Sequence, residues 1–332
     1  DTIVGNAGAD SITGGAGDDI ITGGDGADIL TGGAGSDIIT GGDAVDTIVG
    51  NAGADSITGG AGDDIITGGD GTDTFNVDSG TDTVNDLGGS SGGENDIVII
   101  SAGATVNANN IVSFVATSAT QNNSTDAGNA VLTAKSGAGR TISVANATGS
   151  SKAFTLVGSD GNDSLTGGAG DDIISVTSAG HANADILDGG AGTDTLVLSS
   201  GTHTLTSENK IVNIENINLS TSGSGTNVDL TGQTEAFTIT AGNFANTIKS
   251  GGGADTIVGG TNVDTITGGA GDDIITGGAG NDIITIDSGE DKVKDLGGAS
   301  GSEQDVVVVN AGATLNAIDI IGFTATNATK ND

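Results

Sequence analysis

Aliphatic residues recur along this chain at a fixed spacing of nine positions. The first column runs, in order, through Ile3, Ile12, Ile21, Leu30, Ile39, Ile48, Ile57, Ile66, Phe75 and Val84. Within each repeat the apolar residue has polar or small neighbours, as in a short strand that buries one face. One strand and turn of nine residues cannot enclose a core, so the pattern predicts an all-β solenoid of stacked repeats.

Between the predicted strands, turn residues follow in the constant order Gly-Gly-x-Gly-x-Asp. The nine letters GGAGDDIIT occupy residues 14–22, 59–67 and 268–276. The glycines at the first, second and fourth positions allow positive φ, as a tight turn needs, and let another backbone approach closely. The six-residue pattern is complete where it begins at Gly14, Gly23, Gly32, Gly59, Gly68, Gly167, Gly189, Gly268 and Gly277.

The sixth-position aspartates form a second column, two residues before the aliphatic one. The column starts at Asp1, and its spacing of nine makes disorder a poor explanation for so acidic and glycine-rich a chain. Before the last block the aliphatic column extends backwards through Ile248, Ile239 and Leu230, whereas Asn246, Phe237 and Val228 occupy the aspartate position. We expect these coils to stack without ions.

Charge and composition narrow the choice of partners. The formal net charge is −36, from 44 acidic and 8 basic residues, so nucleic acid and anionic membrane surfaces are unfavourable partners and cations are favourable ones. The chain has no cysteine, which excludes disulfides, and no apolar run long enough for membrane insertion. Carboxylates and turn carbonyls are oxygen ligands of the kind that Ca²⁺ prefers, whereas Zn²⁺ favours His and Cys.

The repeat G-G-x-G-x-D-x-U-x, where U is aliphatic, resembles the RTX calcium-binding nonapeptide of secreted proteins of Gram-negative bacteria. The resemblance implies a parallel β-roll in which two nonapeptides form one coil and aspartates 18 residues apart share an ion. Examples of such pairs are Asp10 with Asp28, Asp19 with Asp37, Asp55 with Asp73 and Asp264 with Asp282. It also implies turn carbonyls as further ligands, for example those of Gly14, Ala16 and Asp18. The expected calcium ligands are Asp10, Asp19, Asp28, Asp37, Asp46, Asp55, Asp64, Asp73, Asp82, Asp163, Asp172, Asp185, Asp194, Asp255, Asp264, Asp273, Asp282 and Asp291. The copies GGDAVD (41–46) and GGTNVD (259–264) lack the fourth glycine, which leaves complete ligation there open.

A longer period lies above the short one, because residues 73–120 resemble residues 282–329 at a shift of 209 positions. We therefore expect a parallel β-roll or β-helix solenoid with calcium-binding turns, interrupted by calcium-free β segments. The predicted segments are an RTX β-roll block (1–86), a calcium-free β segment (87–157), a short RTX block with an insertion (158–205), calcium-free β-helical coils (206–245), an RTX block (246–296) and the start of a second calcium-free segment (297–332).

Catalytic motifs are weak in this sequence, and we predict that the chain is not an enzyme. Ser91 lies in a G-x-S-x-G pattern that is followed by a strand-like run instead of the helix a hydrolase needs. His181 and His203 stand alone and are expected on the surface.

The chain resembles RTX-type bacterial surface-layer proteins in its Thr, Ala, Gly and Asn content, its alternating blocks and its recurring 209-residue unit. This resemblance implies a secreted structural protein, exported by type I secretion to the extracellular space or cell surface, that folds on Ca²⁺ and assembles with copies of itself into a layer, sheet or filament. The alternatives are a stalk segment of a large RTX adhesin and the calcium-binding secretion tail of an enzyme or toxin.

Overall fold

The computed structural model describes residues 1–89, 94–124, 129–149, 151–176, 185–208, 210–220, 223–296, 303–318 and 330–331. Its regular elements are β-strands, and these ranges contain no α-helix. The strands divide between two units, Asp1–Ile174 with Gly189–Gly192 and Ser175–Asp188 with Thr193–Asp332. Strand β19 (Ile173–Val176) begins in the first unit and ends in the second. Ser91 and His181 lie outside the described residues.

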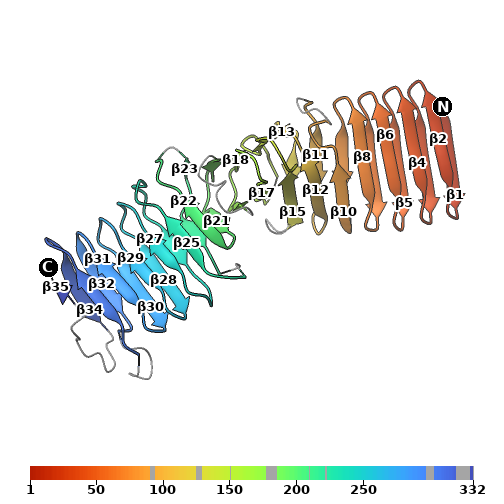
Figure 1. The fold of residues 1–332 in the computed structure, drawn as a ribbon. Helices are drawn as coiled ribbons and strands as arrows, with labels where there is room; N and C mark the ends of the chain where they lie inside the picture. Colours follow the sequence, from red (N-terminus) through yellow and green to blue (C-terminus); the bar gives the residue numbers. More distant parts are fainter. Residues whose placement is uncertain are drawn as a thin grey trace. The chain divides into compact units, whose positions relative to one another are not determined.

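The first unit is built from three parallel sheets whose strands alternate along the chain (Figure 1). One sheet contains, in spatial order, β1 (Thr2–Ala7), β3 (Ile20–Asp25), β5 (Ile38–Asp43), β7 (Ser56–Ala61), β9 (Thr74–Val77), β11 (Ile97–Ile100) and β14 (Gln121–Asn122). The facing sheet contains β2 (Ser11–Ala16), β4 (Ile29–Ala34), β6 (Thr47–Ala52), β8 (Ile65–Asp70), β10 (Thr81–Asn85), β12 (Thr105–Ile111), β15 (Ala130–Ala134) and β17 (Thr155–Val157). A third sheet contains β13 (Ser113–Val115), β16 (Thr141–Ser143) and β18 (Ser164–Thr166).

The second unit repeats this plan. One sheet runs through β21 (Thr195–Leu198), β24 (Asn216–Asn218), β26 (Thr238–Thr240), β28 (Thr256–Thr261), β30 (Ile274–Ala279), β32 (Glu290–Lys294) and β34 (Thr314–Ile318). Another runs through β22 (Gly201–Thr204), β25 (Thr226–Asp229), β27 (Thr247–Lys249), β29 (Thr265–Thr267), β31 (Ile283–Ile286), β33 (Val306–Val309) and β35 (Lys330–Asn331). Strands β20 (Ile186–Asp188) and β23 (Ile211–Val212) pair with each other.

The strand register confirms the parallel β-roll and its two nonapeptides per coil. Ile21 of β3 lies beside Ile39 of β5, and Leu30 of β4 lies beside Ile48 of β6, a shift of 18 residues in both sheets. Successive coils therefore place equivalent residues next to each other. The aliphatic column becomes the core, where Ile21, Leu30, Ile39 and Ile48 are all 0 % exposed.

The stack also continues through segments that lack the motif. In the first unit β11 pairs with β9, β12 with β10, and β15 with β12 and β17, so the chain after residue 94 adds coils to the same roll. In the second unit Val228 lies beside Ile248, and Ile248 lies beside Ile266. The expected extension of the aliphatic column is confirmed for Ile248 and for Ile239, which lies beside Ile257. It was wrong for Leu230, because the shift between the coils of Val228 and Ile248 is 20 residues and Val228, expected at the aspartate position, takes the place in the column.

The glycines of the motif have two different roles in the structure. In most complete copies the second and fourth glycines adopt positive φ, as at Gly33 (130°) and Gly35 (137°), because the tight turn requires it; Gly168 and Gly170 do not. A Cβ at Gly33 would lie 2.0 Å from the carbonyl oxygen of Gly15 in the preceding coil. The first-position glycines, such as Gly32, lie outside the positive-φ region and are needed for space beside the aspartate.

No helix in the described ranges is long and apolar enough to cross a membrane.

Candidate calcium sites

The aspartate column lies inside the turns of the roll. Alternation along each repeat turns Asp19, the aliphatic Ile21 and the next first-position glycine, Gly23, toward the interior. From Asp19 to Asp82, each aspartate of the column is at most 2 % exposed. The sequence pattern that buries the aliphatic residue therefore buries a carboxylate two residues before it.

One carboxylate oxygen, Oδ1, hydrogen-bonds its coil to the coil before it. The backbone N–H of Asp10 donates to Oδ1 of Asp28 at 2.8 Å, and the N–H of Asp28 donates to Oδ1 of Asp46 at 2.8 Å. The same bond joins Asp264 to Asp282 at 2.8 Å. The structure thus brings together the aspartates 18 residues apart that the resemblance paired, while ion sharing between them stays a prediction.

The other carboxylate oxygen, Oδ2, is buried without a hydrogen-bond donor at many of these positions. Within the described residues this holds for Asp10, Asp19, Asp28, Asp37, Asp46, Asp55, Asp64, Asp73, Asp82, Asp264, Asp273, Asp282 and Asp291. An unpaired buried carboxylate oxygen is costly, because it has lost its water and gained nothing in return. Such a row of orphaned oxygens is the observation that points most directly to a bound cation.

At several of these positions a second oxygen lies beside the orphaned one. A Cβ built on Gly14 would lie 2.4 Å from Oδ2 of Asp19 and 2.8 Å from the carbonyl oxygen of Gly32 in the next coil. A Cβ on Gly41 would lie 2.3 Å from Oδ2 of Asp46 and 2.4 Å from the carbonyl oxygen of Gly59. We call this space, bounded by the first-position glycine, the aspartate Oδ2 and the next coil's carbonyl, the cradle.

The cradle suits a hard cation. Ca²⁺ takes six to eight oxygen ligands at about 2.3–2.6 Å, from carboxylates, carbonyls and water. No group of three or more His, Cys, Asp or Glu side chains in the described part of the chain could hold a metal ion by itself, so backbone oxygens would have to supply the remaining ligands. A bound Ca²⁺ ion would neutralise the negative charge of the buried carboxylates.

Burial changes the titration of these groups. Burial, together with the charges of Asp64 and Asp28, raises the pKa of Asp46 to about 6, even though the hydrogen bond from the N–H of Asp28 lowers it. Burial likewise raises the pKa of Asp73 and Asp82 to about 7. The surroundings of these three carboxylates therefore disfavour their charged form.

The predicted carbonyl ligands have different positions. Gly14 is the first-position glycine of a cradle. The carbonyl oxygen of Gly32, the equivalent residue of the next coil, borders the same cradle. The third-position carbonyl, equivalent to that of Ala16, is used differently, since the carbonyl of Ala34 accepts from the N–H of Gly17 at 2.6 Å. The side chain of Asp18 accepts from the N–H of Ser36 in the next coil at 2.8 Å, and so it bridges turns.

The two copies without a fourth glycine keep the turn. Ala44 has φ 79° and Asn262 has φ 72°, so both residues adopt the left-handed conformation that glycine would supply. Oδ2 of Asp46 and Oδ2 of Asp264 face complete cradles. The backbone at these copies is therefore compatible with ligation.

Other predicted ligands have a different setting. Oδ2 of Asp163 accepts from the N–H of Ser159 at 2.6 Å, and Oδ2 of Asp172 accepts from the N–H of Gly168 at 2.6 Å. Oδ2 of Asp255 accepts from the hydroxyl of Ser250. Asp185 and Asp194 are buried directly before β20 and β21, respectively. Their role as calcium ligands stays a prediction.

Sequence reasoning missed members of the column. Asp96 accepts from the N–H of Asp73, and Asp305 from the N–H of Asp282, at a separation of 23 residues instead of 18. Glu215 accepts in the same way from the N–H of Asp194, at 2.8 Å. Insertions had moved these acids out of phase. The signal that could have found Asp96 is the aliphatic Val98 two residues later, as in every repeat.

The expected surface position of His203 was wrong. His203 is 0 % exposed and lies beside Val228 in the strand register, and its Nε2 is 2.8 Å from the carbonyl oxygen of Ser199. Burial lowers the pKa of its imidazole.

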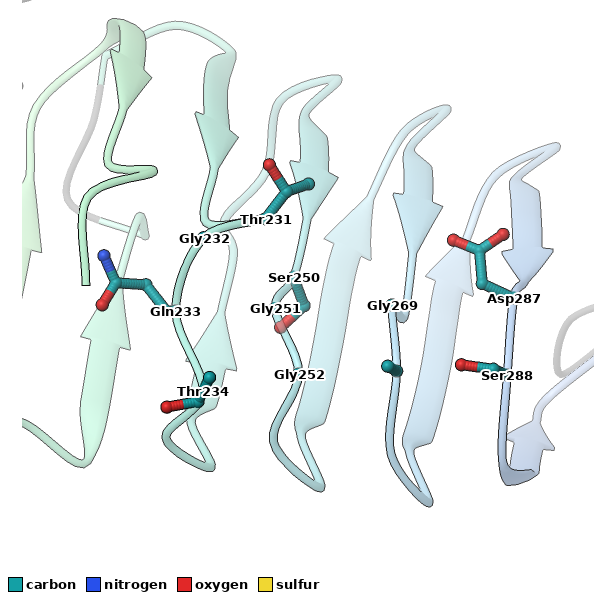
Figure 2. Close-up of a pocket in the computed structure, with 11 residues that line it drawn as sticks. Thr231, Gly232, Gln233, Thr234, Ser250, Gly251, Gly252, Gly269, Asp287 and Ser288 are labelled. Atoms are coloured by element: carbon teal, nitrogen blue, oxygen red, sulfur yellow. The ribbon is translucent and has the colours of Figure 1, made fainter.

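The described lining of the groove in Figure 2, about 350 Å³ in volume, contains a single ionisable side chain, Asp287, and therefore offers no acid–base pair.

Comparison with known proteins agrees with the geometry. The profile described as "RTX calcium-binding nonapeptide repeat (4 copies)" matches residues 1–30, 22–57, 49–84, 155–176, 177–202, 238–266 and 258–293, more than half of the chain. A search of curated proteins finds no match.

Proposed function

We propose, from the premise that this chain belongs to the RTX calcium-binding nonapeptide repeat family, that it is a structural segment of a secreted protein. The repeats bind several Ca²⁺ ions. In the proposal, calcium binding folds the repeat blocks, and the folded chain assembles with copies of itself into a surface layer, sheet or filament. Export by type I secretion and an extracellular or cell-surface location belong to the proposal, which includes no catalytic activity.

The row of orphaned Oδ2 atoms supports calcium-dependent folding. The coils rise by about 4.8 Å, less than the Debye length of about 8 Å at physiological salt, so neighbouring carboxylates repel each other. Without a cation this repulsion and the lost hydration oppose the folded roll. Binding free energy then becomes folding free energy.

Circular dichroism of the chain with millimolar Ca²⁺ and with excess chelator tests the folding step. We expect strand signal with Ca²⁺ and a disordered spectrum with chelator, reversed when Ca²⁺ is restored. Mg²⁺ at the same concentration serves as the control, since it requires shorter distances and near-octahedral geometry. An unchanged spectrum after chelation contradicts calcium-dependent folding.

Electron microscopy of the same samples tests the assembly step. Sheets or filaments that form only with Ca²⁺ support the surface-layer function. Dispersed folded rods at the same concentration favour the adhesin stalk or the secretion tail, because Ca²⁺ would then stiffen the monomer without joining copies.

A further inference from the structure

One repeat of the second unit differs from the motif at a single position. Residues 250–255 read SGGGAD, so Ser250 stands where the nine complete copies of the motif have the first-position glycine. Ser250 directly follows β27 and is 1 % exposed. Figure 2 shows Ser250 with Gly251 and Gly252 on one coil and Gly269 on the coil beside it.

Protein donors satisfy both oxygens of Asp255 in this repeat. Oδ1 accepts from the N–H of Phe237 at 2.7 Å, as in other coils. Oδ2 accepts from the hydroxyl of Ser250, and the backbone of Gly251 also donates a hydrogen bond to the carboxylate. At Asp264 and Asp273, in the same unit, Oδ2 is buried and has no such donor.

The serine also occupies the volume that a cation would need. A Cβ on Gly32, a first-position glycine of the first unit, would lie 2.3 Å from Oδ2 of Asp37 and 2.8 Å from the carbonyl oxygen of Gly50. Both distances are shorter than real Cβ contacts, so a side chain at this position crowds the two oxygens. A side chain in place of the glycine of such a cradle therefore meets the two oxygens that an ion there would bind.

We propose that the hydroxyl of Ser250 replaces a calcium ion at Asp255, so that this coil closes without metal next to coils that need it. Ser250 is then the residue that decides where calcium binding stops in the second unit. The inference rests on the proposed calcium-dependent folding. The rest of this turn suits an ion, because the N–H of Asp255 donates to Oδ1 of Asp273 at 2.9 Å and the next coil carries the complete motif GGAGDD.

The test is the number of Ca²⁺ ions bound per chain in Ser250→Gly, which restores the complete pattern as GGGGAD. Calcium is counted by elemental analysis after gel filtration and by calorimetric titration. We expect Ser250→Gly to bind one ion more than the unsubstituted chain. Ser250→Ala is the matched control, since it keeps Cβ in the cradle but removes the hydroxyl, and we expect an unchanged ion count and a lower thermal midpoint.

Gly32→Ser is the reciprocal variant, placed at a backbone conformation that serine can adopt. We expect it to lose one ion. An equal count in Ser250→Gly and the unsubstituted chain overturns the proposal, as does an additional ion in Ser250→Ala. If the unsubstituted chain binds calcium but only these differences fail, the proposed function stands without the inference; if that chain binds none, both fail.

Discussion

The close stacking of the turns makes a quantitative prediction about one glycine. Gly60 of β7 has φ 106°, and a Cβ there would lie 2.2 Å from the carbonyl oxygen of Gly42 in the preceding coil. Ordinary van der Waals contact of a Cβ atom begins at 3.4 Å, so the Cβ of Gly60→Ala would lie roughly 1 Å too close to this oxygen. The carbonyl belongs to backbone that is itself paired in β5, and neither strand can move without loss of sheet hydrogen bonds.

Two effects contribute to the expected loss of stability. The left-handed backbone costs an L-residue about 1–2 kcal/mol. Overpacking against rigid neighbours adds about 1–3 kcal/mol, so we expect Gly60→Ala to lower the free energy of unfolding by about 2–5 kcal/mol. Gly103 is the matched control: it has φ 84°, but a methyl group at this position would meet no atom within 4 Å, so Gly103→Ala should cost only about 1–2 kcal/mol.

Urea unfolding followed by circular dichroism, with calcium held at saturation, measures both variants. Saturating calcium matters because a change in affinity would otherwise be read as a change in packing. Equal losses in Gly60→Ala and Gly103→Ala would refute the close-approach argument and leave only the backbone cost. A calcium count on each variant shows whether either one has lost an ion.

Single features of the roll support three further predictions. Ala44 has φ 79°, so Ala44→Gly should stabilise the folded state by about 0.5–1 kcal/mol, seen as a higher thermal midpoint; a lower midpoint would contradict strain at this turn. Ile48 is 0 % exposed, so Ile48→Ala should cost about 2–5 kcal/mol in urea unfolding, and a loss below about 1 kcal/mol would mean that the column is loosely packed. Burial raises the pKa of Asp73 and Asp82 from 3.8 to about 7, so the folded calcium-free chain takes up protons and should gain structure as the pH falls from 7 toward 4. Circular dichroism in chelator checks this, and a loss of structure on acidification would oppose it.

Much of the fold could be predicted from periodicity, because a roll repeats the same local solution. A spacing of nine residues with one aliphatic position places Ile21, Ile39 and Ile57 in one column, and the structure pairs them in that register. The aspartate column follows from the same alternation. Asn246 occupies the aspartate position in a coil without the motif. Its Oδ1 makes the same contact as an aspartate, because it accepts from the N–H of Thr226 at 3.0 Å.

Contacts between coils could not be read from one repeat. Asp96 joins the column 23 residues after Asp73 instead of 18, so it is out of the phase that the sequence displays. The separate roles of first- and second-position glycines are likewise invisible in the motif. Both become clear only when the neighbouring coil supplies the atom that a Cβ would meet.

The sequence by itself determined the strand period, the buried aliphatic column, the acidic column and the preference for a hard cation, because these depend on residues within nine positions of each other. The tertiary structure decided which carboxylates retain an oxygen without a donor. Asp37 and Asp255 occupy the same place in the motif, yet Oδ2 of Asp37 is orphaned and Oδ2 of Asp255 is bonded to Ser250. The physical reason is that a hydrogen bond and a cradle depend on the distance between atoms in space, and only the folded stack fixes that distance.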